Sequence, residues 1–266
     1  MKKKGWMAVA GVLLAAGIAC GGMALKSYYE DKNAGQNYEA LREEVTSKSS
    51  GDSKKEIKVT ATPEPTATAT PVPVEIPIDF ASLTSQYPDV YAWIQIPGTK
   101  IDYPILRREG DNSYYLNHTL EGEERIEGAI FTEDYNKKDF TDPNTVIYGH
   151  NMRNGSMFRG LHDYQDPAYL PEHQEVLIYL PDRILHYQIF AAYTYDSRHL
   201  LESFDFTDQS VFQGYLDSIL GRKEMGSSID RSVDVTSEDK IITMSTCNGN
   251  DDQRYLVQAV LLSIES

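Results

Sequence analysis

One cysteine, one histidine and one arginine in this 266-residue chain stand where residue type and spacing permit nucleophilic chemistry. Cys247 follows an apolar β-type run at 241–246 and opens a polar loop, and the ends of strands are where scaffolds present reactive groups. Arg254 opens the next β-type run, so pairing of the two strands would bring its guanidinium close to the sulfur. A fixed cation there favours thiolate, or stabilises the oxyanion formed when a thiolate attacks a carbonyl.

The cysteine count leaves three interpretations of this thiol open. Of the two cysteines, Cys20 lies in an apolar N-terminal run, so Cys247 has no partner for a disulfide within an exported domain. A lone thiol there is an inert buried residue, a link to another chain, or a nucleophile. Arg254 by itself equally suits a surface ion pair with Asp251 or Asp252.

A cysteine nucleophile also needs a group that accepts and returns a proton, and His150 is the best candidate. It follows the β-type run 146–148 through Gly149 and enters a polar loop, which is again a strand end. The other five histidines lie in ordinary polar or aromatic sequence and are interpreted as structural or solvated: His118, His162, His173, His186 and His199. The spacing therefore suggests a site made of Cys247, His150 and Arg254.

The sequence of the N-terminal third predicts a membrane anchor followed by a spacer. Lys2–Lys4 precede an uncharged run at 5–25, which is long enough for a membrane span with its N-terminus inside the cell. A cleaved signal peptide and a lipoprotein site at Cys20 are the rival interpretations, and all three export the rest of the chain. We assign 1–26 to a transmembrane anchor and 27–77 to an extracellular stalk, with a short helix at 38–45 and a Pro/Thr-rich spacer at 59–77. The protein is thus expected in the cell membrane, single-pass, with its C-terminal part extracellular.

Residues 78–266 have the composition of a folded, soluble domain. The chain has 25 basic and 40 acidic residues, a net charge of −15, and the whole surplus falls after residue 79. Such acidity argues against binding to nucleic acid or to an anionic membrane surface. Eight β-type runs are expected at 93–96, 101–106, 128–132, 145–148, 175–180, 184–195, 240–246 and 255–264. Helices are expected at 80–87, 156–163 and 208–220, the last behind a Thr207 or Asp208 cap. The pattern predicts a mainly β barrel or sandwich with helical insertions.

Several short motifs together resemble the sortases, and class B in particular. In chain order they are 96–99 with 101–104, Asp111-Asn112 before Tyr114–Leu116, 128–131, Tyr148–Met152 with 155–158, and Ser245–Cys247 followed by Arg254. The resemblance spans about 80–264 and includes the helix at 208–220. One departure is Gly249, where some class B members carry Asp, so no catalytic acid is assumed there.

The resemblance implies an eight-stranded sortase-type β-barrel with N-terminal helices and a helix inserted before the Cys-bearing strand. It implies a thiol transpeptidase at the Gram-positive cell surface, in which Cys247 attacks the Thr carbonyl of a C-terminal sorting signal to give a thioester. His150 would exchange protons with the leaving and incoming amines, and Arg254 would hold the oxyanion. The same comparison places Asn112, Leu116, Tyr148 and Ser245 beside the signal.

The implied partners are surface proteins that bear a sorting signal and an amine acceptor, such as lipid II or a pilin Lys. No cofactor is expected, and no metal, because the acidic residues lack the spacing of a calcium loop. Two alternatives stay open at this point. One is an exported cysteine peptidase that releases the acyl group to water, and the other is a wall-binding module with a degenerate site.

Overall fold

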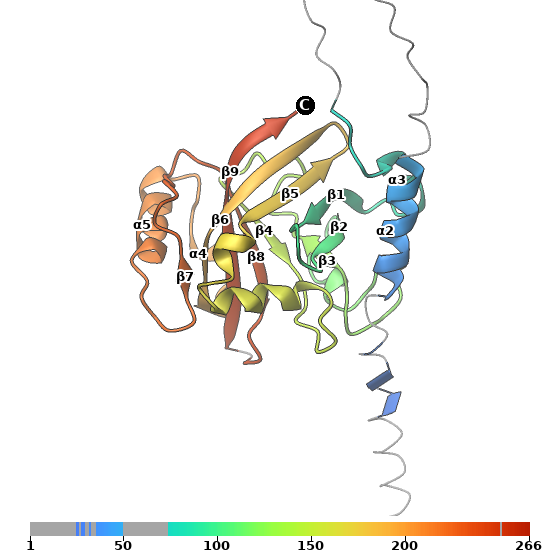
Figure 1. Ribbon diagram of the computed structural model, residues 1–266, viewed down its shortest axis with the longest axis horizontal. Coiled ribbons are helices and arrows are strands. Elements are labelled where there is room, and N and C mark those ends of the chain that lie inside the picture. Colours follow the sequence, from blue (N-terminus) through green and yellow to red (C-terminus); the bar gives the residue numbers. More distant parts are fainter. Residues whose placement is uncertain (1–24, 27, 30–31, 33–35, 50–73, 251) are drawn as a thin grey trace, which may run out of the picture.

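The computed structural model describes residues 25–26, 28–29, 32, 36–49, 74–250 and 252–266 (Figure 1). The expected membrane anchor and most of the Pro/Thr-rich spacer lie outside these residues. Within the described part, no helix combines the length and apolarity needed to cross a bilayer.

Eight strands form a closed barrel, as predicted. They are β1 (Val90–Gln95), β2 (Asp102–Leu106), β3 (Ile130–Thr132), β4 (Asn144–Tyr148), β5 (Glu175–Leu180), β6 (Arg183–Asp196), β8 (Ile241–Cys247) and β9 (Gln253–Glu265). Their order is β5-β1-β2-β3-β4-β8-β9-β6, and β6 pairs back onto β5, which closes the ring. The sequence pattern did not indicate the short β7 (Ser228–Ile229). It pairs with Ala191 and Ala192 of β6, past the part of β6 that pairs with β5.

The apolar strands β8 and β9 are buried on both faces because two separate cores flank them. Ile242 and Met244 of β8 belong to the core inside the barrel. Ile241 of β8 and Leu256 of β9 belong to a second core outside it, under helix α5 (Gln209–Leu220). In Figure 1, α5 lies on the outer side of the barrel, near α4 (Leu200–Ser203) and β7. A strand covered on both faces needs apolar residues at successive positions, which explains the run before the cysteine.

The connections between strands carry short helices. Helix α5 begins after Asp208, whose carboxylate accepts hydrogen bonds from the backbone N–H of Ser210 and Val211. This confirms the predicted cap and the helix before the Cys-bearing strand. Two connections contain 3₁₀ segments: η1 (Tyr114–Leu116) lies between β2 and β3, and η2 (Phe158–Gln165) and η3 (Leu170–Glu172) lie between β4 and β5. The helix expected at 156–163 is therefore η2, a tighter 3₁₀ segment.

Two N-terminal helices, α2 (Gln36–Ser49) and α3 (Phe80–Gln86), pack beside the barrel (Figure 1). The helix expected at 38–45 lies within α2. Tyr38 is 3% exposed and donates a hydrogen bond to the carbonyl of Gly128 at 3.0 Å. Arg42 Nε lies 3.0 Å from a carboxylate oxygen of Asp102. Although α2 falls within the segment assigned to the stalk, its apolar stripe is buried, so this helix is part of the folded unit.

We expect Tyr38→Ala to reduce the free energy of unfolding by about 3 kcal/mol, because it leaves a cavity where an aromatic ring was buried. Tyr38→Phe, which removes only the hydrogen bond to Gly128, should cost about 1 kcal/mol. The exposed Glu43→Ala on the same helix is the control and should change little. Urea denaturation measures all three, and equal stability of Tyr38→Ala and Glu43→Ala would show that α2 does not stabilise the barrel.

Candidate active site

The β8–β9 hairpin places Cys247 directly beside Arg254. The two strands pair antiparallel, and Cys247 is the register partner of Arg254 at the loop end of the hairpin. Every β8 residue is buried except Cys247, which is exposed and not in a disulfide. In the connecting loop Gly249 has φ +77°, a left-handed conformation that favours glycine and accounts for its departure from the Asp of some relatives. The predicted proximity of the guanidinium to the thiol follows from this register.

The parallel pairing of β4 with β8 brings in His150. Tyr148 pairs with Ser245, and the N–H of Gly149 donates to the carbonyl of Ser245 at 3.1 Å. Two residues further along both strands, His150 comes level with Cys247. Gly149 admits no side chain here, because a Cβ would lie 2.4 Å from Ile130 Cδ1. The chain therefore passes closely between neighbouring side chains on its way to the histidine.

The imidazole of His150 is held on two sides. Its Nε2 donates to the carbonyl of Leu116, at the end of η1, over 2.6 Å. In the neutral ring the free lone pair then lies on Nδ1. A hydrogen bond with Cys247 raises the pKa of His150 above its ordinary value, and this outweighs the effect of burial, which lowers it. His150 is therefore biased toward carrying a proton beside the sulfur.

A hollow of about 280 Å³ opens next to Arg254. All four residues predicted to contact a signal peptide line it together with Arg254: Asn112, Leu116, Tyr148 and Ser245. The side chain of Leu116 is 48% exposed, whereas Ser245 is 5% exposed. The structure thus brings these four together beside the cysteine-bearing strand, while their role in binding stays a prediction.

The wall of the same hollow contains a polar cluster that sequence reasoning missed. Nε2 of His199 lies 2.6 Å from a carboxylate oxygen of Glu133, and Tyr148 donates to the same carboxylate at 3.0 Å. Burial, followed by the charge of Glu133, raises the pKa of Tyr148, so its hydroxyl keeps its proton. His199 was interpreted as structural or solvated because nothing in the local sequence links residues 133 and 199.

Two further side chains hold the backbone of Cys247. Nδ2 of Asn151 and Nε2 of His162 both donate to the carbonyl of Cys247, at 3.1 and 2.9 Å. Asn151 takes the position of the next donor in the β4–β8 ladder after Gly149. Burial lowers the pKa of His162, which favours the neutral ring in this arrangement. Sequence reasoning missed both residues, although the position of Asn151 directly after His150 was a usable signal.

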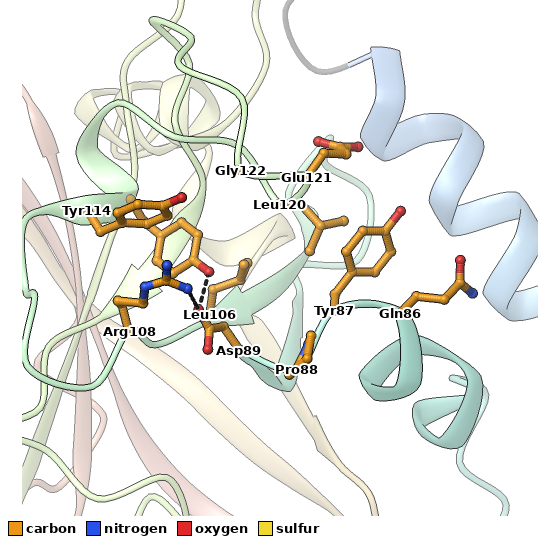
Figure 2. Close-up of a pocket in the computed structure, with 11 residues that line it drawn as sticks. Gln86, Tyr87, Pro88, Asp89, Leu106, Arg108, Tyr114, Leu120, Glu121 and Gly122 are labelled. Carbon is orange, nitrogen blue, oxygen red and sulfur yellow. Dashed lines mark hydrogen bonds and ion pairs between the residues drawn. The ribbon is translucent and has the colours of Figure 1, made fainter.

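A separate hollow of about 440 Å³ lies behind η1, away from the cysteine (Figure 2). Asp89 accepts hydrogen bonds from Arg108 at 2.8 Å and from the Tyr115 hydroxyl at 2.7 Å, shown as dashed lines in Figure 2. The bond to Tyr115 ties Asp89 to η1, the turn whose Leu116 carbonyl receives His150. Asp89 therefore supports the η1 turn, and the hollow contains none of the three predicted catalytic residues.

A β-barrel that presents an exposed cysteine, a histidine hydrogen-bonded to it and an adjacent arginine at one end defines a thiol-dependent acyl-transfer enzyme. In the described residues no cluster of three or more His, Cys, Asp or Glu side chains suited to a metal is found. The chemistry available to these groups is covalent catalysis through a thioester.

Comparison with known proteins agrees with this class. A family model described as a sortase domain matches residues 94–262. Sortase B of Listeria monocytogenes is 35% identical over 178 residues, which cover 66% of this chain and 70% of that protein. Sortase B of Staphylococcus aureus is 27% identical over 270 residues, covering 99% of this chain and 100% of the relative. The solved S. aureus sortase B–substrate complex is 30% identical, with a TM-score of 0.62 over 69% of this chain and 84% of that one.

The chain belongs to the sortase family, and within it to class B; it is a cysteine transpeptidase of the sortase type. A sortase B from Bacillus anthracis, 24% identical, shares the fold with a TM-score of 0.64 over 86% of this chain and 99% of its own.

The pairing of His150 with the thiol predicts a measurable titration change. In Cys247→Ala the hydrogen bond that does most to raise the pKa of His150 is gone, whereas burial still lowers it. The pKa of His150 should therefore fall relative to the wild type, as NMR titration of the ring protons would report. The resonances of His186, remote on β6, should be the same in both proteins. An unchanged His150 midpoint would show that the two side chains do not interact in solution.

The two donors to the Cys247 carbonyl should matter for rate. A hydrogen bond contributes about 1 kcal/mol, so Asn151→Ala and His162→Ala should each lower kcat/KM roughly five- to tenfold as the nucleophile loses its fixed position. His162→Gln keeps a donor and should recover part of the loss, while His186→Ala is the matched control. The pH profile of thiol alkylation should change in His162→Ala. Equal rates in His162→Ala and His186→Ala would exclude a positioning role.

Proposed function

We propose that this protein is a membrane-anchored, cell-surface transpeptidase that cleaves a C-terminal sorting signal after Thr and transfers the substrate protein to an amine. One observation carries the proposal: Cys247, His150 and Arg254 meet at one end of the barrel, beside a hollow that the four predicted signal-binding residues line. A nucleophile, a proton carrier and an adjacent binding surface are the minimum that such a reaction needs.

In the first half-reaction the sulfur of Cys247 attacks the Thr carbonyl carbon, forming a C–S bond and a tetrahedral oxyanion. Arg254, the register partner of Cys247, is placed to donate hydrogen bonds to this oxyanion. As the oxyanion collapses, the scissile C–N bond breaks and His150 gives its proton to the departing amine. The raised pKa of His150 supports this step, because the ring then holds the proton that the leaving group requires.

In the second half-reaction an incoming amine attacks the thioester carbonyl. Neutral His150 takes the proton from the amine, the C–S bond breaks and the thiolate is restored beside the imidazolium. The hydrogen bonds that Asn151 and His162 donate to the Cys247 carbonyl support both steps. They fix the backbone of Cys247 while its sulfur gains the acyl group and then loses it. We propose a cell-wall precursor such as lipid II, or a pilin Lys, as the source of the amine.

Two relatives support this assignment of partners. One solved structure is that of a Staphylococcus aureus sortase B–substrate complex, and another is of a sortase B complexed with a glycine tripeptide, which has a free amine. By analogy, we propose that this chain accepts a peptide substrate and an amine-bearing acceptor. The apolar run at 5–25 behind Lys2–Lys4 supports the membrane anchor and the extracellular location of the catalytic domain.

The full chain incubated with a sorting-signal peptide, with and without an amine acceptor, tests the proposal. We expect the acceptor to divert the acyl product from the free acid to the amide. Cys247→Ala and His150→Ala should each abolish product, and Arg254→Ala should reduce it at least a hundredfold, because one oxyanion donor contributes roughly that much. Arg183→Ala, at the start of β6 and paired with Asp182, is the matched arginine control.

Three results would overturn the proposal in different ways. Product formed only as the free acid, whatever the acceptor, would identify a cysteine peptidase. Normal turnover of Cys247→Ala would exclude the thioester mechanism. Absence of both product and thiol labelling in the folded wild type would identify a binding module with a degenerate site.

A further inference from the structure

The loop that follows His150 forms one side of a basic hollow of about 560 Å³. Lys100, from the β1–β2 turn, and Arg153 and Arg159, from the segment after β4, line this hollow. Asp163 is the one acidic residue among its lining residues, so the lining carries a net charge of +2. The part of the chain after residue 79 has fifteen basic and thirty acidic residues, so a group of three cations with one acid is a clear exception.

The cations of this hollow are only partly neutralised. Arg159 Nη1 lies 3.4 Å from Asp163, and both side chains are about half exposed, so this pair is weak. Among the residues that the structure describes, neither Lys100 nor Arg153 has a carboxylate within ion-pair distance. In contrast, two surface lysines of the β3–β4 connection are paired: Lys137 with Asp142 and Lys138 with Glu109. Two unpaired cations in one hollow therefore provide a place for an anion.

The geometry brings these cations together from two separate turns. A Cβ placed on Gly155 would lie 3.5 Å from Lys100 Nζ, so the amino group reaches the tip of the 151–157 loop. Gly155 itself has φ +89°, and the loop is closed by a bridge between Asn151 and Met157. The side chain at residue 153 and the amino group of Lys100 thus stand at the same loop tip.

The same loop and η2 form part of the catalytic centre on their other side. The N–H of Phe158 donates to the carbonyl of His150 at 2.9 Å, which closes the base of the loop at the catalytic histidine. In η2, Arg159 lines the basic hollow, whereas His162 bonds to the carbonyl of Cys247. The segment 150–163 therefore separates the basic hollow from the cysteine and contacts both.

We propose that this basic hollow binds a phosphate-class oxyanion carried by the amine acceptor, and so holds the acceptor beside the loop that follows His150. A diphosphate or a phosphate monoester matches the net charge of the lining, and two guanidinium groups with an ammonium provide the donors that phosphate oxygens accept. The acceptor role rests on the proposed transpeptidation, whereas binding of the oxyanion does not.

The position of the hollow also sets the length of a suitable acceptor. Arg153 lies three residues beyond His150, and even an extended chain covers only about 3.3 Å per residue, so the backbones of these two residues are at most roughly 10 Å apart. An acceptor whose amine and phosphate are separated by about that distance or less reaches both. The phosphate oxyanion could come from either of two sources, a lipid-linked precursor that carries a diphosphate or free inorganic phosphate. Only the lipid-linked precursor also supplies an amine.

Direct binding tests the site without any need for turnover. Inorganic pyrophosphate is titrated into the full chain in neutral detergent and followed by calorimetry. We expect saturable binding that weakens at least tenfold in the double variant K100Q/R153Q and stays unchanged in the matched double variant K137Q/K138Q. Acetate should bind much more weakly than pyrophosphate. Absence of saturable pyrophosphate binding, or equal binding in both double variants, would overturn the proposal.

Kinetics then tests the acceptor role. Two acceptors are compared, glycylglycine aminoethyl phosphate and the matching glycylglycine ethylamide, which lacks the phosphate. The ratio of kcat/KM for the phosphorylated over the neutral acceptor should exceed one in the wild type and fall at least fivefold in K100Q/R153Q. An equal ratio in the two proteins would exclude the acceptor role. If neither acceptor diverts the acyl product, both the proposed transpeptidation and the acceptor role of the hollow are wrong. The pyrophosphate titration still decides whether the oxyanion site exists.

Discussion

The parallel pairing of β4 with β8 determines where His150 lies relative to Cys247. Because Tyr148 is level with Ser245, His150 comes level with Cys247, and the antiparallel pairing of β8 with β9 adds Arg254. Side chains alternate between the faces of a strand, so a slip of one residue would move every inward side chain of β8 out of the barrel. The core inside the barrel and the core under α5 both oppose that slip. The packing of the whole domain therefore maintains an alignment that the small active site could not enforce.

The segment from His150 to η2 makes the surroundings of the cysteine asymmetric. A hollow with Arg254 and the exposed Leu116 lies beside the cysteine-bearing strand, and a separate basic hollow around Lys100 lies along the loop that follows His150. Between them, Asn151 and His162 hold the Cys247 carbonyl with side-chain donors where the β-ladder has ended. A thioester formed at this point has a different chemical environment on each flank, which suits a reaction with two different peptide substrates.

The strands, and the proximity of Cys247, His150 and Arg254, could be predicted because both depend on local signals in the sequence. The catalytic roles of these three residues stay a prediction. Apolar runs bounded by polar loops indicated the barrel strands, and Cys247, His150 and Arg254 each stand at the end or start of such a run. The missed features depend on contacts between distant segments. The burial of α2 needs the barrel surface, the two-residue β7 is too short to show a pattern, and the contact of His162 with Cys247 joins residues 85 positions apart. No periodicity within a window of the sequence contains that information.

The exposure of Cys247 has a consequence for its redox chemistry. A thiol that must meet a bulky peptide is open to oxidants as well, and in the extracellular location proposed above it would meet them without cellular thiols nearby. Cys20, the second cysteine of the chain, belongs to the apolar N-terminal run, so the catalytic domain supplies no resolving thiol. A sulfenic acid formed on Cys247 therefore cannot be protected as an internal disulfide and would progress to irreversible oxidation unless a thiol from another molecule reduced it. The working lifetime of each enzyme molecule then depends on the redox state of its surroundings as well as on the stability of its fold.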